Sequence, residues 1–368
     1  MSKFLKSVCT LALLITSISL FSCSAKGRKN LTPVNIKAIE VEKDDYTYKI
    51  DPRLELLLIG LRLAENPFFY NNVYGSNEYV SSVDSFFDKH KEHSFVKSLK
   101  NLNKLKDFRL EAILSLANYI SEDFTQINFP DNKCPAYIKD VWKNTNFKKL
   151  ISEMNDFALT SKYDRFLLVH DADIKKALYD AREFFTVNED FLPYLQELFS
   201  TKEKPLEINF CVTPLLAGRF MVLPASTSLL FSPYYSYNSS NDIYFINYYI
   251  ESIAYRLIYD NWEKLSAPAN AYIKKLYQQT QNPNKITDFI CQSTIANVIS
   301  ISTLLDYIEE YADEEEYDQF RNYIFNEEIY KPYMPFYTQL LEFFENRQAY
   351  HNFYDFFDQN MIKILETL

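Results

Sequence analysis

The sequence predicts an α+β fold that is predominantly helical. Three observations support this class. Apolar residues recur at helical spacing over residues 51–200, a β-branched and apolar segment occupies residues 206–232, and helical spacing resumes over residues 241–366. We therefore expect a helical N-terminal part, a short β-sheet or hairpin, and a long helix that opens a helical C-terminal part.

The first helix is expected over residues 51–67, because both of its ends carry recognisable signals. Asp51 can cap the N-terminus, Pro52 suits the first helical position, and Pro67 closes the run. The alternating segment at residues 45–50 before it is typical of a strand. Turns rich in Asn, Asp and Pro separate the helices that follow, which we expect at 78–92, 93–104, 108–121, 136–158, 171–183 and 189–200.

The segment 206–232 differs in amino-acid composition from the predicted helices on either side. It opens with LEINFCVTPLL and continues with two more apolar stretches, which predicts two or three strands. A polar, aromatic loop at residues 234–242 follows, and no internal repeat of fixed period is present. The remaining helices are expected at 241–263, 267–279, 286–311, 313–325, 332–346 and 349–366.

The N-terminus predicts a secretory signal peptide over residues 1–22. Lys3 and Lys6 precede an apolar run, and small and apolar residues then lead into Cys23. The sequence LFSC at this point resembles the lipobox of bacterial lipoproteins, in which the signal is cut before the cysteine and the cysteine carries the lipid. This resemblance implies that Cys23 is lipidated. The alternative is an ordinary signal peptide whose cysteine is incidental.

The mature chain then divides into two parts. Residues 23–45 are polar and basic at their start, which predicts a lipidated tether. No Pro/Gly/Ser-rich linker interrupts residues 46–368, so we expect a single α-rich domain there. An acidic run directly after the cysteine, which resembles the surface-export signal of some bacterial lipoproteins, is absent. We therefore expect a protein anchored in the outer membrane and facing the periplasm.

The composition argues against several classes of function. A net charge of −10 argues against nucleic acid as a partner. Four glycines in the whole chain are too few and too scattered for a phosphate-binding loop, so we expect no nucleotide cofactor. Beyond the signal and Cys23, the cysteines are Cys134, Cys211 and Cys291, which allow one disulfide at most or three buried thiols.

One helix, expected over residues 242–262, carries a candidate site. Its apolar stripe is typical of a core-facing helix, and Glu251 lies beside that stripe with Tyr248 and Tyr255 as neighbours. Zinc peptidases use His-Glu-x-x-His, in which two histidines hold the metal and the glutamate is the general base. Here the same frame has Ile250 and Ala254 at the two histidine positions.

Long stretches of the chain, among them DPRLELLLIGLRLAENPFFYNN, VDSFFDKHKEHSFVKSLKNL and FRLEAILSLANYI, resemble the bacterial lipoprotein family known as domain of unknown function 4932. The resemblance runs from about residue 46 to the end. It implies a zincin-like fold, with the His-Glu-x-x-His helix after a short sheet and a glutamate on a later helix. At that last position this chain has Gln292, within the segment 288–300.

These departures predict a protein that has lost its metal site. Ile250 and Ala254 cannot bind zinc and Gln292 is a poor third ligand, so we expect neither a metal nor a catalytic residue. The predicted role is a pseudo-metallopeptidase that binds a peptide, protein or glycan in a cleft beside Tyr248, Glu251 and Tyr255. Two alternatives stay open: an active hydrolase that uses Glu251 with other residues, and a structural interaction lipoprotein. On the peptidase-like frame, Glu251 is expected to be partly buried and to accept a hydrogen bond from a tyrosine or the backbone.

Overall fold

The computed structural model describes fourteen stretches of the chain. The signal peptide, Cys23 and the first part of the predicted tether lie outside them. The described residues are 31–36, 38–43, 46–66, 78–102, 110–142, 145–187, 190–199, 209–215, 221–222, 228–231, 239–277, 288–311, 314–326 and 331–368.

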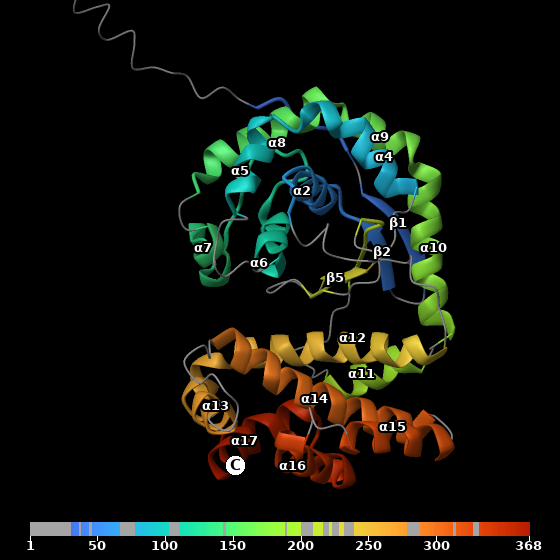
Figure 1. Ribbon diagram of the computed structural model, residues 1–368, viewed down its shortest axis with the longest axis vertical. Helices are drawn as coiled ribbons and strands as arrows, with labels where there is room; N and C mark the ends of the chain where they lie inside the picture. The colour runs from blue at the N-terminus through green and yellow to red at the C-terminus, as the bar shows by residue number, and fades with distance from the viewer. Residues whose placement is uncertain are drawn as a thin grey trace, which may run out of the picture.

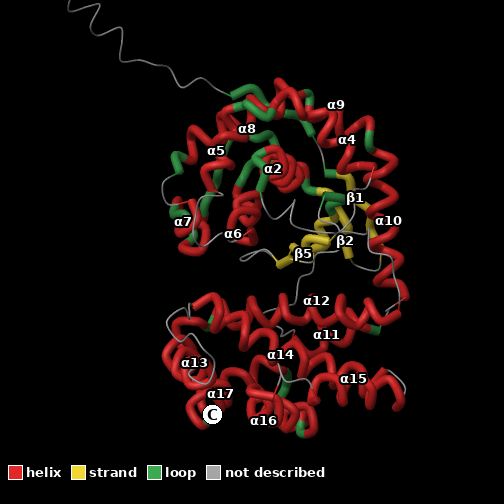
Figure 2. The backbone as a smooth tube through the Cα atoms, viewed as in Figure 1, coloured by secondary structure: helices red, strands yellow, loops and turns green. Residues whose placement is uncertain are grey.

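Helices form most of the described chain, and one small sheet lies among them (Figure 2). This confirms the predicted helix-rich class with a small sheet. In Figure 1, helices α4, α5, α8 and α9 arch over α2, and α10 runs beside the sheet. The elements before the sheet's third strand are β1 (Ile39–Lys43), β2 (Tyr46–Ile50), α2 (Pro52–Leu63), α4 (Glu78–Phe87), α5 (Ser94–Leu102), α6 (Leu110–Leu114), α7 (Ala136–Trp142), α8 (Phe147–Ser161), α9 (Tyr163–Val169), α10 (Asp171–Val187) and α11 (Phe191–Phe199).

The sheet has five strands in the order β1-β2-β3-β5-β4, with β3 (Asn209–Val212), β4 (Met221–Val222) and β5 (Ser228–Phe231). Strands β2, β3 and β5 are parallel, and the outer strands β1 and β4 each run antiparallel to their neighbour. Across the β2–β3 contact, Tyr48 and Phe210 are register partners, and their rings stack with centroids 4.6 Å apart.

The predicted tether over residues 23–45 is too long, since β1 begins at Ile39 and pairs with β2. The two or three strands expected over residues 206–232 are present as β3, β4 and β5, and β4 and β5 pair antiparallel. The prediction missed that the sheet extends beyond this segment, because β3 pairs in parallel with β2. The reason is that parallel pairing joins segments far apart in the chain, and no local pattern reveals such a partner.

Helix α2 lies at the centre of the N-terminal part. Its predicted start is confirmed: Asp51 caps the helix by accepting the Arg53 amide at 2.9 Å, and Pro52 is the first helical residue. All but two of its residues are buried, so it is enclosed on all sides. Gly60 permits the close approach of α5, since a Cβ atom there would meet the Leu99 side chain at 2.5 Å.

The predicted single helix over residues 136–158 is wrong, since two helices, α7 and α8, occupy this region. Asn146 starts the second helix, because its side chain accepts the backbone N–H of Lys149 at 3.1 Å. Helix α8 then ends at Lys162, whose left-handed backbone turns the chain into α9.

The C-terminal helices pack on one another beyond the sheet, at the opposite end of the molecule from α8 (Figure 1). Their predicted positions agree with the structure to within a few residues. In the described part of the chain, no helix is long and apolar enough to cross a membrane. The helices are α12 (Ser239–Asp260), α13 (Trp262–Tyr277), α14 (Asp288–Tyr311), α15 (Glu314–Asn326), α16 (Met334–Glu345) and α17 (Phe353–Thr367).

The three remaining cysteines form no disulfide with one another. Cys211 and Cys291 are buried, and Cys134 is half-buried. They therefore occupy apolar or partly apolar surroundings as thiols.

Candidate functional site

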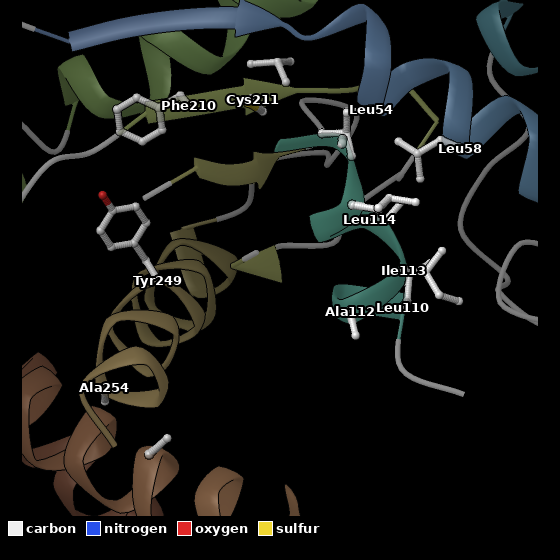
Figure 3. Close-up of a cluster of buried hydrophobic side chains, with 14 of the residues drawn as sticks. Leu54, Leu58, Leu110, Ala112, Ile113, Leu114, Phe210, Cys211, Tyr249 and Ala254 are labelled. Carbon is white, nitrogen blue, oxygen red and sulfur yellow. The ribbon is translucent and has the colours of Figure 1, made fainter. Parts of the chain in front are cut away.

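Helix α12 lies between the sheet and helix α14. On one side, Tyr249 extends from α12 towards β3, where its ring centroid is 6.2 Å from that of Phe210 (Figure 3). On the other side, Ala254 points towards the C-terminal helices (Figure 3). Helix α12 is thus the element through which the sheet contacts the C-terminal helical layer.

Two inter-helix hydrogen bonds join α12 to α14. The Ser300 hydroxyl contacts both the backbone oxygen and the side-chain oxygen of Asn247, at 2.7 and 2.6 Å. The Tyr255 hydroxyl donates to the Gln292 side-chain oxygen at 3.1 Å. As position rises along α12 it falls along α14, so the two helices are antiparallel. We call this line of contact the α12–α14 seam, formed by Asn247, Glu251, Tyr255, Gln292 and Ser300.

Glu251 lies within the seam, between the two hydrogen bonds. It is four residues from Asn247 and four from Tyr255, and residues at this spacing share one face of a helix. In the antiparallel register the residue of α14 level with Glu251 is Ala296, which is fully buried.

The Glu251 carboxyl is half-buried, and burial raises its pKa from the ordinary value of 4.5 to about 7. None of the described groups donates a hydrogen bond to it. We expected a tyrosine or backbone donor, but the hydroxyl of Tyr255 is bonded to Gln292 instead. The side chain of Tyr248, the other predicted donor, lies outside the described residues. The carboxyl can therefore take up or release a proton near neutral pH.

At the two positions that hold zinc in the peptidase frame, this chain has aliphatic side chains that pack in the core. Ile250 and Ala254 are both 0% exposed and belong to the hydrophobic core. Gln292, at the third predicted position, is 6% exposed and is held by Tyr255. The structure thus brings Glu251, Tyr255 and Gln292 together in one seam, with aliphatic side chains in place of metal ligands.

The histidines lie elsewhere and make local contacts. A ring nitrogen of His93 lies 3.1 Å from the Asp156 carboxylate, and a ring nitrogen of His170 lies 2.9 Å from that of Asp173. Within the described residues no group of three or more His, Cys, Asp or Glu side chains is arranged to hold a metal ion.

A second buried carboxyl, Glu55, was not singled out from the sequence. It is 1% exposed and accepts hydrogen bonds from Tyr79 at 2.8 Å and from Thr213 at 2.6 Å. Burial raises its pKa to about 7, although both hydrogen bonds act in the opposite direction. The signal was present in the sequence, since Glu55 is the one acidic residue inside the leucine-rich run of α2. Because Glu55 is enclosed and accepts both hydrogen bonds, it is a structural group that links α2 to α4 and to the residue that follows β3.

A groove of about 910 Å³ lies between α16 and α17, and none of its lining residues belongs to α12 or α14. It is therefore separate from the seam.

No family model matches this chain, and no curated protein or solved structure matches it. The resemblance to domain of unknown function 4932 therefore stays a prediction, as does lipidation of Cys23, which lies outside the described residues.

Proposed function

We propose that this protein is a lipid-anchored binding protein of the bacterial cell envelope with a degenerate zincin-like frame. It holds a peptide, protein or glycan beside the α12–α14 seam without cleaving it. The anchor is Cys23, and the domain faces the periplasm from the outer membrane.

The observation that carries this proposal is the contrast between neighbouring positions on α12. Ile250 and Ala254, at the metal-binding positions of the frame, are 0% exposed and packed in the hydrophobic core. Glu251, between them in sequence, remains half-buried with a carboxyl to which no described group donates. Partial burial disfavours the charged carboxylate, and a ligand with a hydrogen-bond donor beside Glu251 would stabilise it.

The order and placement of elements support the zincin-like part of the proposal. A small mixed sheet precedes α12, and a later helix, α14, packs against α12. Gln292, at the position where the resemblance implies a glutamate, reaches α12 through its bond with Tyr255. Contact between Gln292 and α12 is expected if the later helix of a zincin-like fold contributed a residue to the same site as α12.

Among the three ligand classes, strand β4 favours a peptide. It stands at one end of the strand order and packs against α12. An edge strand can pair with an extended chain through its backbone groups, and the neighbouring helix then supplies side-chain contacts.

The test uses the purified full chain and a library of unstructured decapeptides, followed by fluorescence anisotropy for binding and mass spectrometry for cleavage. We expect saturable binding and intact peptides, with or without added zinc. Glu251→Arg should weaken binding at least tenfold, while Glu263→Arg, a matched change on the exposed face of α13, should leave it unchanged.

The two alternatives give different results. Peptide cleavage that Glu251→Gln abolishes would establish the active hydrolase. Absence of both binding and cleavage would favour a structural interaction lipoprotein.

A further inference from the structure

We propose that the α8–α9 end of the molecule rests on the membrane that holds the anchor, with the side chains of Leu168 and Val169 inserted at the lipid surface. This inference rests on the proposed lipidation of Cys23. It adds an orientation for the whole domain and assigns an exposed apolar surface to a lipid partner.

The first observation is an unusual exposure of apolar side chains. Leu168 is 76% exposed and Val169 is 65% exposed, both at the C-terminal end of α9. Leu159, near the end of α8, is 42% exposed. Three of the six large apolar side chains that are exposed in the described part of the chain thus fall within eleven consecutive residues. Single exposed apolar residues are common, but several close together in one helix pair are a candidate contact surface for a partner.

The second observation is where the tether reaches the domain. The Asn155 side chain of α8 donates to the backbone oxygen of Thr32 at 2.9 Å. Val34 is buried, and its backbone N–H donates to Asp123 at 3.0 Å. The chain that leads back towards the lipid is therefore fixed against α8 before it leaves the domain.

The length of the tether limits how far this end can lie from the bilayer. Leu31 lies eight positions after Cys23, so even a fully extended tether spans only about 28 Å. A flexible chain of this length has a typical end-to-end distance of about 16 Å. Along α8, the rise from Asn155 to Lys162 is about 10 Å, so the apolar cluster begins within reach of the anchored end.

The charged side chains at the α8–α9 end of the molecule suit contact with a lipid surface. Exposed Lys162 and Arg165 flank the apolar side chains and can contact lipid phosphates, and exposed Asp164 keeps the surface near neutral. A few apolar side chains beside basic groups are typical of proteins that lie at the headgroup boundary. We favour the membrane over a second copy of the chain because the anchor already holds this end at the bilayer.

The orientation has a functional consequence. The C-terminal helices lie at the opposite end of the long axis from α8 and α9 (Figure 1). With α8 and α9 on the membrane, the α12–α14 seam faces away from it. A ligand in the periplasm can then reach the seam without passing the lipid.

The experiment places an environment-sensitive fluorescent amino acid at position 168 of the full, lipidated chain in vesicles of phosphatidylethanolamine and phosphatidylglycerol. Quenching by lipids that carry a nitroxide near the headgroup should be several-fold stronger than for the same fluorophore at Asn322, an exposed control position on α15. With the reporter at Leu159, the double change Leu168→Ser and Val169→Ser should reduce the quenching several-fold.

The outcomes separate this inference from the proposed function. A chain that carries no lipid and stays in the soluble fraction would remove the anchor, and the inference with it. An anchored chain with equal quenching at positions 168 and 322 would overturn only the inference. A reporter at 168 that is shielded from water but not quenched by lipid would indicate a second protein copy and would also overturn it.

Discussion

Replacing Glu55 by glutamine is expected to stabilise the protein above pH 7 and to leave its stability near pH 4.5 almost unchanged. Glu55 is 1% exposed, and burial raises the pKa of its carboxyl to about 7 from an ordinary 4.5. In the unfolded chain the carboxyl loses its proton near pH 4.5, whereas the folded protein keeps that proton up to about pH 7. Stability contributed by the protonated group is therefore complete below pH 4.5 and is lost as the pH rises to 7.

The size of the effect follows from this difference. At about 1.4 kcal/mol for each pKa unit, the rise from 4.5 to 7 corresponds to about 3–4 kcal/mol of unfolding free energy at high pH. Glutamine does not titrate, and its amide matches the neutral acid in shape. Its oxygen can accept from Tyr79 or Thr213, and its NH₂ can donate to the other hydroxyl once that hydroxyl turns. The variant should therefore lack this part of the pH dependence.

The assay is urea unfolding at a series of pH values from 5 to 8, followed by far-UV circular dichroism. The difference between Glu55→Gln and wild type should grow from about 1 kcal/mol at pH 5 to about 3 kcal/mol at pH 8 in favour of the variant. Glu263→Gln, on the exposed face of α13, is the control and should track wild type. Glu251→Gln should show a smaller change of the same sign, because solvent screens its half-buried carboxyl. A Glu55→Gln variant less stable than wild type at pH 8 would refute the reasoning, since Glu55 would then be a stabilising carboxylate.

Three further outcomes are expected. Mass spectrometry of the mature protein should find an acylated N-terminal Cys23, and a soluble mature chain that starts elsewhere would contradict this. Elemental analysis should find no stoichiometric zinc, because Ile250 offers no ligand where the frame needs one; one zinc per chain would overturn the non-catalytic proposal. Arg347→Ala should lower the unfolding free energy by about 1–3 kcal/mol, because half-buried Asp306 loses a cation 3.3 Å away. Glu197→Ala, which removes an exposed partner of the same arginine, should cost less than about 1 kcal/mol in the same urea titration, and equal losses would contradict the assignment.

Local signals predicted the helices well, because helix formation depends on neighbours in sequence. The cap at Asp51 and the spacing along α12 each appear within one segment. The sheet depends on distant partners: β2 pairs with β3 across all the helices from α2 to α11. Strand β1 was missed because its segment, IEVEK, alternates within a charged stretch, and the Asp44-Asp45 pair that follows it was not interpreted as a turn signal.

The candidate site divides in the same way. Helical spacing was enough to place Glu251 and Tyr255 on one face of the same helix. It could not reveal that the Tyr255 hydroxyl bonds Gln292, since that contact crosses 37 residues of chain. The position of Glu55 inside a leucine-rich run was visible in the sequence, but its hydrogen bonds to Tyr79 and Thr213 were not, because they join segments distant in the chain.

Burial raises the pKa of two carboxyls, Glu55 and Glu251, to about 7. The surroundings of these two groups differ, and the difference bears on function. Glu55 has the hydroxyls of Tyr79 and Thr213 as donors and no access to solvent, so the fold has already satisfied it. Glu251 has burial without a donor among the described residues, and it keeps access to solvent. Water can therefore reach the Glu251 carboxyl, and burial raises its pKa with no donor among the described groups to offset the change. The nearby Ile250 and Ala254 are completely buried. Of these three positions, Glu251 is therefore the one that can offer a polar group to a ligand with a hydrogen-bond donor.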